Sequence, residues 1–536
     1  MPSRFRPSST EPVNRAGTDR VLALLLYAAA ALAAAVVAAN AVAGIAFDSD
    51  HMGDTLFILG AGWRVHEGLR PALDFGHFYG GTVACGLAAT MRLFGATVFA
   101  FDYFLLAVFA LLSALGVVML RGRLSAPGLA ATILIVATLL FTRYPLEVSQ
   151  SVTRLVSTHS FLYNRLALAM LLISGLFAAL SSPQRGREVL GGLLAGGLVV
   201  ATVLAKPTFI VLAPAVLVAL LVQARWLAAA GLIAGAALAA GLFDPGGARW
   251  LASMDYAMAH VGDRDDAGLR PLLRKAVQIP LAQPVVLTFA LAAMGYVLWR
   301  KPREMGAVLA ALIVAAAGVG MAATMGGGGS LGQLAVPIGC MLALAMAELA
   351  RRAGRAHAGC LQAVALLLVA AFALPHLANL LGVTAEGISR RGQVLVHTGP
   401  FTGYLSLPGD TAGTGRATQY EMFADGIDTL TAIEGAAERG IVSDSGVTFE
   451  FALGAPPVAG YPLWQRPEAP ELAPGRPLPD DIDLVLLGRA PNGTPEIAGP
   501  LRAKMGDAFR LCARSAYWDV FARQSTAPAT CPIPAG

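Results

Sequence analysis

The chain has 536 residues, of which 56% are hydrophobic and 14% charged, and its formal net charge is +5. Soluble domains carry about 25% charged residues, because water must solvate most of their surface. The composition therefore excludes an ordinary soluble protein and predicts a surface that faces lipid. The basic residues lie mainly between apolar segments, where they govern membrane topology, so the net charge predicts no nucleic-acid partner.

The apolar segments predict the membrane domain. Residues 1–20 are polar and rich in Pro, Ser and Arg, so we expect a disordered cytoplasmic N-terminus. The apolar segment 21–45 is too long for the core of a signal peptide and lacks a clear cleavage site, which predicts a retained helix. Further segments near the length of a span cover 97–120, 127–141, 161–180, 189–205, 208–221, 226–243, 284–299, 305–321, 334–349 and 360–381. We therefore predict an α-helical polytopic membrane protein with about 11 spans over residues 21–381.

Basic residues follow alternate spans, as the positive-inside rule requires of cytoplasmic loops. They are Arg121, Arg123, Arg185, Arg187, Arg225, Arg300, Lys301, Arg303, Arg351, Arg352 and Arg355. With the N-terminus inside, every inner loop contains one or more of them, and the C-terminal region lies outside. This count requires Lys206 and Pro207 to separate two spans. If they interrupt a single span, everything downstream is inverted.

From 382 to 536 the chain becomes rich in Pro, Gly, Asp and Thr, and no apolar segment is long enough to span a membrane. The patterns predict a helix over 425–439 and strands over 441–443, 482–488, 509–515 and 518–523. We expect a small C-terminal α/β extracytoplasmic domain. In an oxidising compartment Cys512 and Cys531 could form a disulfide, with two unpaired thiols as the alternative.

The first outer loop, residues 46–96, contains the most informative pattern. Asp48 and Asp50 follow the first span directly, with Ser49 between them. Carboxylates at the membrane surface can remove a proton from an acceptor hydroxyl or hold a divalent cation against a phosphate. The alternative is that they only mark where the helix reaches water.

The loop resembles the GT-C class of membrane glycosyltransferases, which includes the protein O-mannosyltransferases and the aminoarabinose transferase of lipid A. In that class an acidic motif follows the first helix, and a G-x-x-P-x-x-D element precedes the next spans. Asp48 and Asp50 occupy the acidic position, and the second element matches Gly68-Leu69-Arg70-Pro71-Ala72-Leu73-Asp74. Many members have Asp-Glu where this chain has Asp-Ser-Asp, so the resemblance does not identify the base.

The resemblance implies catalysis on the outer face of the membrane, with a sugar donor carried on polyprenyl phosphate. The acceptor would be a lipid, a glycan or a protein of the cell envelope. The composition, rich in Ala, Gly and Arg, is typical of a bacterium, which predicts the cytoplasmic (inner) membrane.

Further site candidates lie at the expected outer ends of spans. Arg165, which follows His159 and Asn164, could bind a lipid phosphate, or it could anchor its helix by snorkelling. Lys206 is costly near the bilayer unless it faces a cavity or a partner. By resemblance it would lie near the donor phosphate.

These residues favour an inverting glycosyltransferase. Asp50 or Asp48 would take the proton of the acceptor hydroxyl, and Lys206 and Arg165 would stabilise the departing polyprenyl phosphate. Asp74, His77, His159 and Asn164 would shape the acceptor side of the site. The two Asp residues permit a divalent cation but do not require one.

Two other classes of protein remain open. A secondary transporter or lipid-linked sugar flippase would usually show two related halves with interrupted helices, and no convincing internal repeat is present. A non-catalytic scaffold would leave the acidic loop without a chemical role.

Overall fold

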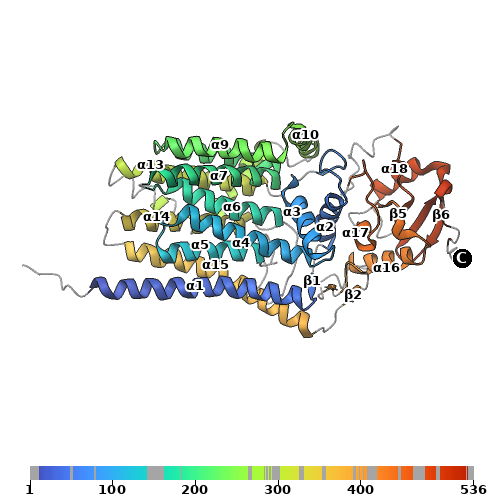
Figure 1. The fold of residues 1–536 in the computed structure, drawn as a ribbon, viewed down its shortest axis with the longest axis horizontal. Coiled ribbons are helices and arrows are strands. Elements are labelled where there is room, and N and C mark those ends of the chain that lie inside the picture. The colour runs from blue at the N-terminus through green and yellow to red at the C-terminus, as the bar shows by residue number, and fades with distance from the viewer. Residues whose placement is uncertain are drawn as a thin grey trace, which may run out of the picture.

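The computed structural model describes most of the chain. The described residues are 11–48, 52–77, 80–141, 162–182, 184–262, 269–282, 284, 288, 291–292, 302–324, 331–352, 358–389, 394–396, 399–402, 404–406, 419–444, 448–462, 477–489, 495–526, 528 and 531. They form a bundle of long helices, a layer of shorter helices at one end of it, and a small domain with a sheet beyond that layer (Figure 1).

Within these residues, seven helices are long and apolar enough to cross a membrane. They are α1 (Glu11–Val42), α4 (Ala100–Leu120), α6 (Leu162–Ala179), α7 (Arg185–Ala205), α9 (Trp226–Phe243), α13 (Pro302–Thr324) and α15 (Ala358–Ser389). Three further predicted spans correspond to α5 (Ala126–Phe141), to η1 (Pro207–Val211) with α8 (Leu212–Leu221), and to α14 (Leu331–Arg352). The predicted span over 284–299 lies largely outside the described residues. The chain is thus a polytopic helical membrane protein.

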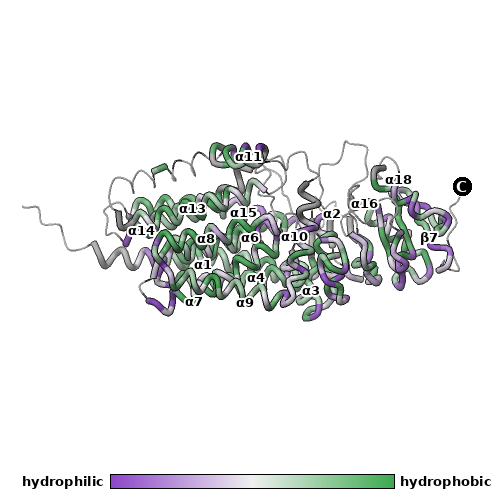
Figure 2. Tube along the Cα trace, turned by 90° about the horizontal axis from the view of Figure 1, so that it is seen from above, coloured by the Kyte–Doolittle hydropathy of each residue, from purple (hydrophilic) through white to green (hydrophobic). Residues whose placement is uncertain are grey.

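The buried fraction of the helices decreases from the centre of the bundle to its periphery. Every residue of α6 is buried, and so is nearly every residue of α5. The peripheral α1 instead exposes Leu24, Leu25 and Leu32. In Figure 2 hydrophobic residues predominate along the helices of the bundle, and hydrophilic ones are more frequent toward its ends and in the sheet domain. An apolar exterior of this kind suits lipid and not water.

At two predicted boundaries a helix extends beyond the apolar segment. We expected residues 1–20 to be disordered, but α1 begins at Glu11. We expected the last span to end at Leu381, but α15 continues to Ser389. In both cases a helix already formed in the bundle extends past it, because adding a residue to an existing helix requires no new nucleus.

The basic loops meet at one end of the bundle, which we call the arginine end. Arg123 is buried there and donates hydrogen bonds to the Leu180 carbonyl (2.6 Å) and to Glu188 (2.7 Å). Arg225 donates to the other carboxylate oxygen of Glu188 at 2.7 Å. Arg352 reaches the carbonyl of Ser181 at 2.9 Å. Four of the loops that charge alone assigned to one side of the membrane are therefore together in space.

The course of α7, α8 and α9 shows that Lys206 separates two spans. Gly192 of α7 faces Ala228 and Leu232 of α9, and Gly196 faces Leu232 and Ala236. Residue numbers rise together along the contact, so α7 and α9 are parallel. The segment between them must run back through the bundle from the far end, which we call the loop end. The start of η1–α8 therefore lies at the loop end, directly after Lys206.

The C-terminal domain is built on a four-stranded sheet of order β4-β5-β7-β6. Its strands are β4 (Ile441–Ser443), β5 (Leu484–Gly488), β6 (Phe509–Arg514) and β7 (Trp518–Arg523), close to the predicted positions. The predicted helix over 425–439 is instead α16 (Gln419–Thr431), followed by a left-handed residue, Gly435, and the short η2 (Ala436–Glu438). A disulfide joins Cys512 and Cys531, the pair that the sequence singles out.

Glycines at the α7–α9 contact predict a large difference between neighbouring substitutions. A Cβ on Gly196 would lie 2.2 Å from the carbonyl oxygen of Leu232, whereas a Cβ on Gly197 would meet nothing within 4 Å. We expect G196A to push the helices apart and cost about 1–3 kcal/mol, as overpacking does. G197A should be neutral or slightly stabilising, since Ala favours the helix more than Gly. Thermal unfolding of the detergent-solubilised protein tests this, and equal midpoints would contradict it.

Candidate functional site

Residues 46–96, the predicted first outer loop, are largely helical where the structure describes them, and they join the C-terminal region in a sheet. They contain β1 (Ala46–Asp48), α2 (Met52–His66) and α3 (Gly81–Phe94). Strand β1 pairs in parallel with β3 (Tyr404–Ser406), which pairs antiparallel with β2 (Val394–Val396). Asp48 is thus the last residue of β1, and its backbone lies opposite that of Ser406. Asp50 and His159 lie outside the described residues, so their predicted roles remain predictions.

A buried ion pair holds the loop against the C-terminal domain. Arg64 of α2 donates to both carboxylate oxygens of Glu450, at 2.6 and 3.1 Å, and to the Tyr461 carbonyl at 2.5 Å. The two charged side chains are only 3% and 2% exposed. Glu450 begins the short helix α17 (Glu450–Leu453). A charge so deeply buried is stable only with its partner, so α2 and α17 are fixed together.

Neutral contacts extend this interface on both sides of the ion pair. The Trp63 indole donates to the Ala455 carbonyl at 2.9 Å and packs against the ring of Phe451. The Thr448 hydroxyl donates to the Leu56 carbonyl at 3.1 Å. The C-terminal domain therefore packs on the first loop at the loop end, with α2 and α17 between the bundle and the sheet (Figure 1).

Asp74 and His77 belong to this same interface. Asp74 pairs with Arg70 at 2.8 Å, and its pKa is lowered chiefly by the hydrogen bond from that guanidinium. The Asp74 carbonyl accepts a hydrogen bond from the Gly460 amide at 2.6 Å. His77 stacks on Phe57 and lies beside Phe75, and burial, together with the charge of Arg64, lowers its pKa to about 3. Both residues shape the loop, and the buried His77 does so by packing.

Close backbone packing brings the first loop to the end of α7. Gly80 lies so near that a Cβ there would be 2.0 Å from the Leu204 carbonyl oxygen. The Thr82 hydroxyl donates to the Ala201 carbonyl at 3.0 Å. Only glycine permits the first of these contacts, because any side chain would overlap the helix backbone. The loop therefore sits immediately beside Lys206.

Lys206 joins the ends of three helices. Its ammonium donates to the Thr324 carbonyl at the end of α13 (3.2 Å) and lies 5.7 Å from the ring of Tyr163 and 5.2 Å from that of Phe209. Tyr163 belongs to the first turn of α6, next to Asn164 and Arg165. The structure thus brings Lys206 to the turn that carries two other predicted site residues.

The start of α6 is a buried polar region. Arg165 is 3% exposed and close enough to His376 of α15 to interact electrostatically with it. Asn164 is 1% exposed, and within the described part of the chain neither of its amide atoms has a hydrogen-bond partner. A buried polar group without a partner costs about 1–3 kcal/mol, so this amide is suited to a ligand.

Thr324, His376 and the Arg64–Glu450 pair were not predicted. A lone His within an apolar segment is a recognisable signal, because polar groups at bilayer depth are costly. The partner of Arg64 has no such signal, since 386 positions separate it from Glu450. Thr324 acts through its backbone carbonyl, which no residue type reveals.

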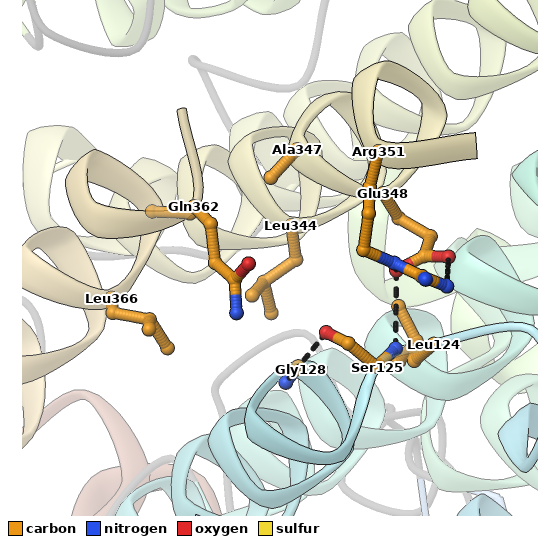
Figure 3. Close-up of a pocket in the computed structure, with 10 residues that line it drawn as sticks. Leu124, Ser125, Gly128, Leu344, Ala347, Glu348, Arg351, Gln362 and Leu366 are labelled. Atoms are coloured by element: carbon orange, nitrogen blue, oxygen red, sulfur yellow. Dashed lines mark hydrogen bonds and ion pairs between the residues drawn. The ribbon is translucent and has the colours of Figure 1, made fainter. Parts of the chain in front are cut away.

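A small cavity lies at the arginine end, away from these residues. It is bordered by α5, α14 and α15, and Arg351 pairs with Glu348 beside it (Figure 3). Glu348 also accepts a hydrogen bond from the Ser125 amide at 3.1 Å. These contacts use the charged groups of the cavity to join helices, so the cavity is separate from the candidate site.

Among the described residues, no group of three His, Cys, Asp or Glu side chains is arranged to hold a metal ion. This does not test the divalent cation considered for Asp48 and Asp50, because the side chains of both residues lie outside the described part of the chain.

Comparisons with known proteins reveal similarity only at the level of structure. No protein-family model and no curated protein sequence matches the chain. It is similar to the crystal structure of ArnT from Cupriavidus metallidurans bound to undecaprenyl phosphate, with 13% identity and a TM-score of 0.43. The match covers 93% of this chain and 97% of that one. At this level of similarity the match assigns neither an activity to the chain nor a role to any residue.

Breaking the buried ion pair should loosen the C-terminal domain. We expect E450Q to destabilise the protein by about 3–5 kcal/mol, because it leaves Arg64 charged and buried without its partner. R64M combined with E450L should recover much of this loss, since no charge then remains buried. Chemical unfolding measures both effects. D74N is the control. It removes the exposed ion pair with Arg70 and should have a far smaller effect. An equal loss in D74N and E450Q would contradict the assignment.

The low pKa of His77 predicts an acid-sensitive interface. Above about pH 6.5 the imidazole is neutral in both folded and unfolded chains, so it makes no pH-dependent contribution. As the pH falls from 6.5 toward 3, the unfolded chain binds a proton that buried His77 does not, and stability falls by about 1.4 kcal/mol per pH unit. Unfolding midpoints at pH 7.5 and pH 5 should therefore differ more for the natural chain than for H77F. Equal shifts would show that another group is responsible.

Proposed function

We propose that the protein is a membrane glycosyltransferase that moves a sugar from a polyprenyl-phosphate donor to an acceptor on the outer face of the membrane. One observation carries the proposal. Lys206 lies between two antiparallel segments of the bundle, beside the first turn of α6 and under the acidic first loop. A cation, a buried polar region and the loop with the predicted base therefore share the loop end.

In this proposal Lys206 and Arg165 bind the donor phosphate and stabilise its charge as the sugar leaves. The ammonium of Lys206 lies beside a backbone carbonyl and two aromatic rings, and a phosphate is the anion that such a cation binds with charged hydrogen bonds. Asn164 would donate to a phosphate or sugar oxygen. Each of these contacts is stronger in a site from which water is excluded.

Asp50 or Asp48 would act as the base that removes the proton from the acceptor hydroxyl as its oxygen attacks the anomeric carbon. The bond from that carbon to the phosphate oxygen breaks, and the polyprenyl phosphate leaves with the electron pair. The configuration at the anomeric carbon is inverted. Proton transfer by a positioned side chain contributes about 10²–10⁴-fold to such a rate.

The same proposal assigns the arginine end to the cytoplasm and the C-terminal domain to the outer side of a bacterial inner membrane. The concentration of Arg at one end supports this orientation. The disulfide between Cys512 and Cys531 supports it independently, because such bonds persist in oxidising compartments and are rare in the cytosol.

Transfer assays on the purified protein test the proposal. Labelled polyprenyl-phosphate mannose, glucose and aminoarabinose are supplied with membrane lipids and envelope glycans, and release of polyprenyl phosphate is measured. We expect K206M to lower turnover by about 10²–10³-fold, with K206R retaining more activity because it keeps the charge. D48N and D50N identify the base, and D507N, on the exposed surface of the C-terminal domain, serves as the control. No release of polyprenyl phosphate by the natural chain would refute the proposed activity, and full activity in K206M and in both loop variants would refute the residue roles.

A further inference from the structure

Charge is unevenly distributed within the C-terminal domain. Residues 382–536 contain 12 Lys and Arg against 17 Asp and Glu, so the domain as a whole is acidic. Residues 489–523 reverse this balance, with six basic residues against three acidic ones. This segment forms α18 (Pro495–Met505), β6 and β7, so its positive charge is concentrated on one part of the domain.

Three guanidinium groups of this segment converge on one carboxylate. Arg514 donates to Asp519 at 2.7 Å, and nitrogens of Arg489 and Arg502 lie 3.9 Å from its two oxygens. The three Arg side chains are 41–62% exposed, whereas that of Asp519 is 15% exposed. We call these three residues the arginine cluster. Because one carboxylate opposes three cations, the cluster keeps a net positive charge.

The cluster also has more hydrogen-bond donors than Asp519 can accept. Each guanidinium offers five N–H donors, and a carboxylate has about four acceptor positions. Arg489 donates one hydrogen bond to the Ser515 carbonyl at 2.5 Å. Within the described part of the chain Arg502 donates no hydrogen bond, and its guanidinium lies 5.4 Å from the half-buried ring of Phe521. A planar cation beside an aromatic ring can bind the charged group of an acidic sugar while the ring packs against the flat face of that sugar.

The backbone that carries the cluster is firmly held. Asp425 accepts hydrogen bonds from the Ser515 hydroxyl (2.5 Å) and the Tyr517 amide (3.0 Å), which fixes the turn between β6 and β7. Trp518 is fully buried and donates to the Met422 carbonyl at 2.7 Å. A ligand would therefore find Arg514 already positioned, at little cost in ordering.

We propose that the arginine cluster binds an acidic glycan through its carboxylate or phosphate groups. Carboxylates and phosphates are the ligands that the guanidinium fork matches with paired hydrogen bonds. Sheet strand β6 lies on the side of the domain away from the membrane bundle (Figure 1). The cluster thus holds part of a long chain at a distance from the bilayer. Only the identification of this glycan as the acceptor rests on the proposed glycosyltransferase function.

Binding to the full-length protein in phosphatidylcholine nanodiscs tests the site without any sugar donor. The probes are oligogalacturonate, the same oligosaccharide with methyl-esterified carboxylates, and a phosphorylated oligomannose. We expect oligogalacturonate or the phosphorylated probe to bind, and the ester to bind much more weakly. R489Q combined with R502Q should lower affinity about tenfold or more, because charged hydrogen bonds are lost.

R510Q is the matched control, since it removes an exposed Arg from the same strand as Arg514 without touching Asp519. Its affinity should stay within about twofold, because salt screens charges beyond roughly 8–10 Å. Failure of both charged probes to bind, binding of the ester as tight as that of a binding acid, or equal effects of R510Q and the double variant would overturn the proposal. K206M separates the two hypotheses. It should lose transfer and still bind glycan. Absence of transfer by the natural chain would refute the enzyme function and leave the glycan site standing.

Discussion

The buried pair of Arg64 and Glu450 is the contact on which the organisation of the loop end depends. Moving two charges out of water is costly, and the cost is recovered only when the partners meet with good geometry. Here they meet through two hydrogen bonds, and Arg64 adds a third to a backbone carbonyl. Because either charge alone would be unstable in this position, the pair permits one arrangement of the first loop and the C-terminal domain. Trp63 and His77 then pack around it without needing charge of their own.

At the opposite end of the bundle, charge has a different role. Glu188 sits between Arg123 and Arg225, so the starts of α7 and α9 and the end of α4 are joined by one carboxylate. Along their length α7 and α9 meet through glycines, with backbones too close for any side chain. Helices in lipid associate through such close packing because lipid provides no hydrophobic drive between them. Because α7 and α9 are parallel, the segment between them must run back through the bundle. Lys206 therefore lies at the loop end, where this segment begins.

The candidate site shows which of its residues can be predicted from sequence patterns and which cannot. Lys206, Asn164 and Arg165 stood out because polar groups near bilayer depth need a partner, and the structure brings them to neighbouring helix ends. Their neighbours Thr324 and His376 come from α13 and α15, and nothing in the order of the chain pairs these helices with α6. Asp74 matched a sequence element well, yet its charge is already engaged by Arg70. The position of a residue within a motif therefore did not predict which partner its charge would meet.

By itself, the sequence determined that the chain is a polytopic membrane protein, which loops share a side, and where the strands of the small domain lie. These features follow from hydropathy, from basic residues and from alternation along the chain, all of which are local. Tertiary structure decided that Lys206 separates two spans, that α1 begins before its apolar segment, and that the first loop carries the C-terminal domain. Each of these depends on which distant side chains meet. Glu450 and Arg64 are 386 positions apart, and their attraction acts only once folding has removed both from water.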